Sequence, residues 1–104
     1  MDILAHLEKV IGDRRNASPD ESYVASLNAR GMPVIARKVG EEGVETVVAA
    51  LTGDDGELIG EAADLVFHLL VLLQARGLTF ADVRAELARR EGVSGHEEKA
   101  ARSE

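Results

Sequence analysis

Two stretches of the sequence, residues 33–52 and 56–76, constrain the fold most, because both are apolar on almost every side at helical spacing. The polar segment 53–56 between them contains two glycines and two aspartates, which is typical of a turn. Two long helices joined by so short a link form an antiparallel hairpin. One hairpin cannot cover all of its own apolar surface, so we expect a second copy of the chain to complete a four-helix core as a homodimer.

Each of these two helices carries one acidic row. Glu41, Glu42 and Glu45 project from one side of the first helix, and Glu61 and Asp64 share one side of the second. Most acidic rows are solvated faces. Here, however, acids follow acids four residues apart, where a solvated face usually carries Glu–Lys pairs. A cation from outside the chain would balance this charge, and Mg²⁺ binds both carboxylate and phosphate oxygens. The rows therefore predict a site for a metal-bound polyphosphate.

The remaining apolar residues predict three shorter helices and no strand. Leucines, isoleucines and valines recur at helical spacing over residues 2–13. Ser18 before Pro19 is expected to cap a second helix that ends at Gly31. Thr79 is expected to cap a fifth helix. The predicted fold class is all-α, a helical bundle built on the long hairpin.

The chain is expected to be a single domain over residues 1–91. Its fifth helix should turn Phe80, Val83 and Leu87 inward. Residues 92–104 have almost no apolar content, which predicts a mobile C-terminal tail.

Composition excludes several classes of protein. The 104 residues include no cysteine, so neither a disulfide framework nor a thiolate metal site is possible. A net charge of −7 and only three aromatic residues disfavour a nucleic-acid partner. The N-terminus lacks the features of a signal peptide, and the apolar run Leu65 to Leu73 is too short to span a bilayer. We therefore expect a cytoplasmic protein with no membrane partner.

Four segments carry a resemblance to a known family. They are Glu41-Glu42-x-x-Glu45, Glu61-x-x-Asp64, Ser22-Tyr23 and Lys38-Val-Gly. Together they resemble the MazG-like superfamily of all-α nucleoside triphosphate pyrophosphohydrolases, and most closely its phosphoribosyl-ATP pyrophosphohydrolase family. The resemblance extends from Arg14 to Leu73, and Gly43 departs from it because the family commonly has alanine there.

The resemblance implies a hydrolase that acts in the second step of histidine biosynthesis. Such an enzyme converts 1-(5-phosphoribosyl)-ATP to 1-(5-phosphoribosyl)-AMP and pyrophosphate, by attack of water between the α and β phosphates. Mg²⁺ held by Glu42, Glu45, Glu61 and Asp64 would neutralise the triphosphate and lower the pKa of a bound water. Glu41 is then expected to be the general base, or to orient that water. Which acid is base and which are ligands stays open.

Four more residues are expected to bind the substrate. Lys38, one turn before the acidic pair, is placed to meet a phosphate oxygen. By the analogy Arg14 and Arg15 could bind phosphates, or they could only interact with the carbonyls that end the first helix. Tyr23 could contact substrate or lie at the edge of the core. His68 could orient the carboxylate of Asp64, or it could be an interior histidine with a hydrogen bond across the dimer.

Two other functions remain open. A house-cleaning nucleotide pyrophosphatase would use the same metal site on another base or sugar, and a non-catalytic dimerisation module would use neither. A di-iron bundle is disfavoured because it needs Glu-x-x-His pairs, and Leu65 stands three residues before His68.

Overall fold

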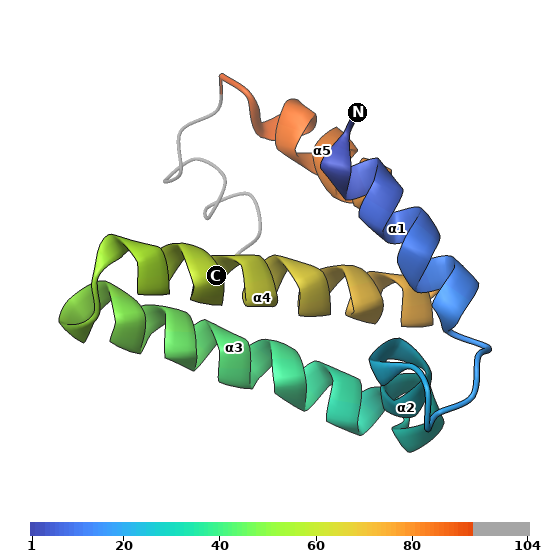
Figure 1. The fold of residues 1–104 in the computed structure, drawn as a ribbon. Coiled ribbons are helices and arrows are strands. Elements are labelled where there is room, and N and C mark those ends of the chain that lie inside the picture. The colour runs from blue at the N-terminus through green and yellow to red at the C-terminus, as the bar shows by residue number, and fades with distance from the viewer. Residues whose placement is uncertain (93–104) are drawn as a thin grey trace.

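The computed structural model describes residues 1–92, and in this part of the chain all regular structure is helical (Figure 1). The helices are α1 (Ile3–Arg14), α2 (Tyr23–Arg30), α3 (Met32–Thr52), α4 (Asp55–Ala75) and α5 (Phe80–Arg90). The all-α prediction is confirmed. The predicted tail lies, apart from Gly92, outside the described residues.

Helices α3 and α4 lie side by side in opposite directions and form the most extensive packing contact of the fold (Figure 1). Only Gly53 and Asp54 separate them. Asp54 is the N-cap of α4, because its Oδ1 accepts a hydrogen bond from the Glu57 backbone N–H at 2.8 Å. This short capped link sets which residues of the two helices face each other.

The buried core lies at one end of this helix pair. Its side chains come from α1, α2, the first turn of α3 and the second half of α4; they are Ile11, Val24, Leu27, Ile35, Leu70 and Val71. At the other end the two long helices continue beyond α1 and α2 (Figure 1). Large apolar side chains are exposed there and along the pair; they are Val44, Val47, Val48, Leu51, Ile59 and Val66. One end of the hairpin is thus packed, whereas the other is covered by nothing in residues 1–92.

The start of α2 differs from the prediction. Ser18 begins a turn instead of a helix, since its carbonyl accepts from the backbone N–H groups of Glu21 and Ser22. Ser22 has extended backbone angles and caps α2, its Oγ accepting from the Ala25 N–H at 3.2 Å. The expected end at Gly31 is confirmed, with a positive φ of 94° that suits glycine.

Helix α5 begins at the expected cap, but it is more peripheral than predicted. Thr79 and Asp82 form a capping box, and Glu8 of α1 accepts a hydrogen bond from the Phe80 N–H at 2.9 Å. Phe80 packs against the core, whereas Leu87 is 58% exposed. The prediction that Leu87 turns inward was wrong, because α5 lies beside α1 at the outside of the fold (Figure 1).

Helix α4 is long and apolar enough to cross a membrane by length and composition alone. The prediction considered only the run from Leu65 to Leu73, which is shorter than the helix. This property carries little weight, because core helices of soluble proteins share it. Helix α4 packs against α3 and carries Glu61, Asp64 and His68 in its middle turns.

The position of the core predicts which leucines stabilise the fold. Leu70 is 1% exposed, so Leu70→Ala should lower the free energy of unfolding by about 2–5 kcal/mol, as expected for a cavity in a packed core. Leu87→Ala is the matched control and should change it by less than about 0.5 kcal/mol. Urea denaturation followed by circular dichroism measures both. Equal losses would contradict the observed placement of α5.

Candidate functional site

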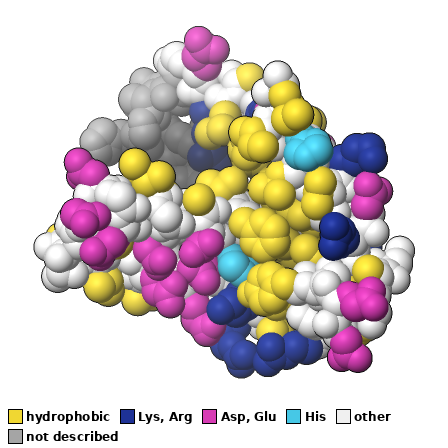
Figure 2. Space-filling view, in the orientation of Figure 1, with side chains coloured by type: hydrophobic (Ala, Val, Ile, Leu, Met, Phe, Trp, Pro, Cys, Tyr) yellow, Lys and Arg dark blue, Asp and Glu magenta, His cyan; other side chains and the backbone are white. Residues whose placement is uncertain are grey.

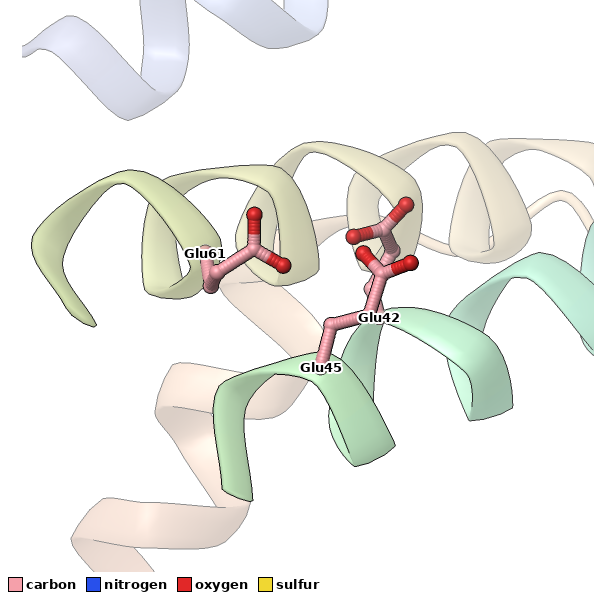
Figure 3. A group of neighbouring side chains, drawn as sticks. All are labelled: Glu42, Glu45 and Glu61. Carbon is pink, nitrogen blue, oxygen red and sulfur yellow. The ribbon is translucent and has the colours of Figure 1, made fainter. Parts of the chain in front are cut away.

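Three carboxylates converge between the two long helices. Glu42 and Glu45 come from α3 and Glu61 comes from α4, and one oxygen of each lies within 4.8 Å of the others (Figure 3). We call these residues the acidic cluster. Figure 2 shows acidic side chains gathered on this part of the surface, beside a histidine and a group of basic side chains. The predicted meeting of the two acidic rows is therefore present.

The geometry of the cluster follows from the helix pair. Glu42 and Glu45 are three residues apart and so share one face of α3. Thr46 joins that face to α4: its hydroxyl lies 2.7 Å from the Glu42 carbonyl oxygen and 3.3 Å from the Glu61 carbonyl oxygen. This contact between the helices is made at two residues of the cluster. Thr46 thereby fixes the spacing of the backbones from which the carboxylates project.

Glu42 is the most buried acid of the cluster. It is 6% exposed, and its Oε2 has no hydrogen-bond partner among the described residues. Burial raises the pKa of the Glu42 carboxyl, and the adjacent Glu45 raises it further. A buried carboxylate oxygen without a partner is costly. A wholly solvated acidic face would not produce it. Lys38 Nζ lies 3.8 Å from the other oxygen, Oε1, so it is Oε2 that needs a cation or a proton.

Glu61 faces the same conflict from the other helix. A side-chain hydrogen bond with Glu45 is the largest cause that raises the pKa of Glu61, followed by burial. Glu45 thus interacts with both neighbours, since it also raises the pKa of Glu42. Without a metal, the three carboxylates can approach one another only by sharing protons. The donor set, all carboxylate oxygens, suits a hard divalent cation.

Asp64 lies at the edge of the cluster. Its charge raises the pKa of both Glu42 and Glu61, so it belongs to the same electrostatic group. Its oxygens are not among those that converge within 4.8 Å. Three of the four predicted ligands are therefore grouped, and the fourth stands one turn of α4 beyond Glu61.

An open pocket of about 550 Å³ adjoins the cluster. Its lining is partly acidic and partly apolar; the residues are Glu45, Val48, Ala49, Thr52, Glu57, Gly60, Glu61 and Asp64. A pocket with this lining can hold a charged, metal-bound group beside an apolar one.

Glu41 and Lys38 form a separate group on α3. Lys38 Nζ lies 3.8 Å from Glu41 Oε1 and 3.8 Å from Glu42 Oε1. Arg37 Nε lies 3.9 Å from Glu41 Oε2. Glu41 therefore has two cations near it and a side chain that is 44% exposed. Among the described residues, Glu42 alone of the cluster has a cation near it, Lys38. Within residues 1–92, Glu45, Glu61 and Asp64 make no ion pair.

Arg14 and Arg15 lie away from the acidic cluster. They end α1, and Arg15 lines a different pocket, together with Gln74 at the end of α4. Gln74 is ten residues beyond Asp64, which is roughly 15 Å along a helix. The structure therefore does not bring these arginines to the carboxylates.

Tyr23 and His68 form one hydrogen-bonded unit. The Tyr23 hydroxyl lies 2.8 Å from His68 Nε2, and His68 Nδ1 lies 2.7 Å from the backbone carbonyl oxygen of Asp64. His68 thus contacts the backbone of Asp64 and not its carboxylate. His68 is interior, as one alternative expected, but its side-chain hydrogen bond is to Tyr23 of the same chain and not across a dimer.

Two residues of the site escaped the sequence analysis. Thr46 stands four residues after Glu42, and a hydroxyl on the acidic side of an apolar helix was the available signal. Arg37 stands four residues before Glu41, and this i,i+4 spacing of a base before an acid was the available signal for their ion pair. Gly40 and Gly43 have open space where a Cβ would lie, so no part of residues 1–92 approaches them closely.

Comparison with known proteins identifies the family of this chain. Residues 4–91 match the family described as phosphoribosyl-ATP pyrophosphohydrolase. The chain is 64% identical to a phosphoribosyl-ATP pyrophosphatase of Erythrobacter litoralis over the full length of both chains. It is 65% identical to one of Novosphingobium aromaticivorans, over 98% of this chain and 95% of the relative. One from Zymomonas mobilis is 64% identical, over 95% and 92%. This all-α chain, with its carboxylate cluster, is matched over nearly its whole length and belongs to the phosphoribosyl-ATP pyrophosphohydrolase family.

Proposed function

We propose that this chain is a hydrolase that converts 1-(5-phosphoribosyl)-ATP to 1-(5-phosphoribosyl)-AMP and pyrophosphate, in the second step of histidine biosynthesis. Membership of the family supports the reaction. The acidic cluster is the structural observation that best supports this reaction. Hydrolysis of a triphosphate requires its negative charge to be neutralised, and a cation held by the cluster would do so. We expect the enzyme to act in the cytoplasm.

The cofactor in this proposal is Mg²⁺, held by Glu42, Glu45 and Glu61 with Asp64 at the edge of the site. The unpartnered Oε2 of Glu42 supports this fit, because a cation would give it the partner that the chain does not. When bound, the ion would neutralise phosphate oxygens and lower the pKa of a coordinated water. The number of ions is left open by the four carboxylates.

The residues beside the cluster take complementary roles. Glu41 is the proposed general base, because it is exposed and lies outside the group of converging oxygens. Lys38 would bind a phosphate oxygen, being close to both Glu41 and Glu42. Arg14 and Arg15 could reach only a part of the substrate remote from the metal. Tyr23 would contact the substrate on the α2 side.

The substrate assignment predicts a clear preference. Pyrophosphate release from phosphoribosyl-ATP should be much faster than release from ATP, dCTP or dUTP. Glu61→Gln should lower kcat by roughly 100-fold or more, because it removes one charge from the cluster. Coupled pyrophosphate assays measure both. Asp13→Asn, which neutralises an exposed acid paired only with Lys9 on α1, is the control and should leave kcat unchanged.

Two outcomes would overturn parts of this proposal. A preference for a plain nucleotide would assign the chain to a house-cleaning activity at the same site. Full activity of the Glu61→Gln variant would show that the acidic cluster takes no part in the reaction.

The raised pKa values predict how metal and pH act on stability. Because the pKa values of Glu42 and Glu61 are raised above 4.5, the folded chain binds protons more tightly than the unfolded one. Metal-free stability should therefore fall as the pH rises from 4.5 through the raised values. Mg²⁺ needs the deprotonated carboxylates, so the rise in Tm that it causes should be larger at about pH 7.5 than at about pH 5.5.

Differential scanning calorimetry measures this dependence, with NaCl at matched ionic strength as the control for screening. An equal rise in Tm with NaCl and with MgCl₂ would contradict a specific site.

We propose further that the active form is a homodimer. The exposed apolar side chains along α3 and α4 support this, because a monomer would leave them in water. Leu51 is 79% exposed on this face. Leu51→Asp should convert the dimer to a monomer in sedimentation velocity runs, because it places a charge in the interface. Ile3→Asp is the control, since Ile3 is 64% exposed on α1. A monomeric wild-type chain would refute the dimer.

A further inference from the structure

Thr46 joins α3 to α4 by a hydrogen bond that involves no carboxylate. Its hydroxyl lies 3.3 Å from the Glu61 carbonyl oxygen on α4 and 2.7 Å from the Glu42 carbonyl oxygen on its own helix. A hydroxyl has a single hydrogen and a backbone carbonyl oxygen only accepts, so the two carbonyls share that hydrogen. The bond thus holds together the backbones of two residues whose carboxylates meet in the acidic cluster (Figure 3).

The apolar contact between the two helices is weak at the level of the cluster. Of the buried residues of α3, Ile35 belongs to the core at the packed end, Glu42 is an acid and Ala49 has only a methyl side chain. Apolar packing is also non-directional and roughly proportional to the area that is buried. Repulsion among the carboxylates pushes the helices apart here, and the directional bond of Thr46 opposes that movement.

The second acceptor distinguishes Thr46 from the other threonine of α3. A threonine inside a helix loses side-chain freedom, and a hydroxyl that bonds only the carbonyl four residues back slightly destabilises the helix. Thr52 makes such a local bond, to the Val48 carbonyl oxygen at 2.8 Å, and in the described part of the chain it makes no bond to α4. Thr46 has the same local bond and, in addition, the one to α4.

The spacing of the two helices bears on which cation the cluster can hold. Mg²⁺ requires oxygen ligands at about 2.0–2.1 Å in nearly octahedral geometry, whereas Ca²⁺ accepts about 2.3–2.6 Å and less regular arrangements. Carboxylates that project from two helices can meet the stricter requirement only if the two backbones are held at a fixed spacing. A looser helix pair should therefore lose Mg²⁺ before it loses Ca²⁺.

We propose that Thr46 is a positioning residue that makes the acidic cluster prefer Mg²⁺ to Ca²⁺. Its hydroxyl holds the backbones of Glu42 and Glu61 at the spacing that the smaller ion requires. Thr46 acts through these backbones and is not proposed as a ligand. This inference rests on the proposed function, since it concerns the cation held at the same site.

Thr46→Val removes the hydroxyl and keeps the branched shape of the side chain. Both carbonyls retain their helical N–H partners, so the variant should keep the helical content of the wild type in circular dichroism. Titration calorimetry with MgCl₂ alone should show the Kd for Mg²⁺ rising roughly tenfold, as for other residues that orient metal ligands. The Kd for Ca²⁺, measured with CaCl₂ alone, should rise much less. An unchanged Kd for Mg²⁺, or an equal rise for both ions, would overturn the inference.

Two matched variants separate the hydroxyl from general effects of substitution. Thr46→Ser keeps the hydroxyl and should restore most of the preference for Mg²⁺. Thr52→Val removes a local hydroxyl bond from the same helix and should leave both Kd values unchanged. A serine variant as impaired as the valine variant would show that any change at this position has the same effect, and would refute the positioning role.

The wild-type chain separates this inference from the proposed function. A wild type that binds neither ion refutes the proposed metal site, and this inference with it. A wild type that binds both ions equally leaves the metal site in place and refutes the preference that Thr46 is proposed to cause. A wild type that prefers Mg²⁺, with the same preference in Thr46→Val, refutes this inference alone.

Discussion

The packing of α3 against α4 is the contact on which the rest of the structure depends, and it brings like charges together. The two helices meet along their apolar faces, and the same contact places Glu42, Glu45 and Glu61 around one point. Repulsion among these carboxylates opposes the packing that assembles them. This repulsion, together with burial, raises the pKa values of Glu42 and Glu61. The packing also leaves Oε2 of Glu42 buried without a hydrogen-bond partner among the described residues. Carboxylate oxygens that converge in this way are the donor set that a hard divalent cation prefers. The packing of α3 against α4 therefore underlies both the fold and the proposed metal site.

The uneven distribution of the core supports this arrangement. Side chains such as Leu27 and Leu70 anchor α1 and α2 to one end of the helix pair, which gives the acidic cluster a rigid base. The far end is covered by nothing in the described chain, and apolar residues such as Leu51 are exposed there. The pocket beside the cluster shares its lining with this apolar face, since Val48 contributes to both. A partner placed over the face would therefore also border the pocket.

Helix α2 is connected to the acidic row by one hydrogen-bonded unit. It is short, yet Ser22 caps it and Val24 and Leu27 bury it, so that Tyr23 at its first position is held in place. Through His68, Tyr23 is linked to the backbone of Asp64, which connects the outer surface of the fold with the acidic row. A peripheral element thus acquires a defined chemical relation to the site. The remaining long-range contacts of the chain, such as Gln74 to the Glu8 carbonyl, are structural.

The sequence by itself determined the helices, the short link and the identity of the acids that meet. Helical periodicity, the aspartate cap before α4 and glycine at the ends of α2 and α4 are local signals, and local signals can be read from the chain. The predicted cap at Ser18 was wrong. Ser18 and Ser22, four residues apart, offer the same capping hydroxyl, and the turn around them decides which one caps α2. The prediction for Leu87 was wrong because the periodicity of a helix does not say how far the helix stays on the core. Only the tertiary structure showed that Glu42 is buried while Glu41 is exposed beside two cations, and that Tyr23 is hydrogen-bonded to His68. These facts depend on which atoms of different helices meet, and no spacing along one chain encodes that distance.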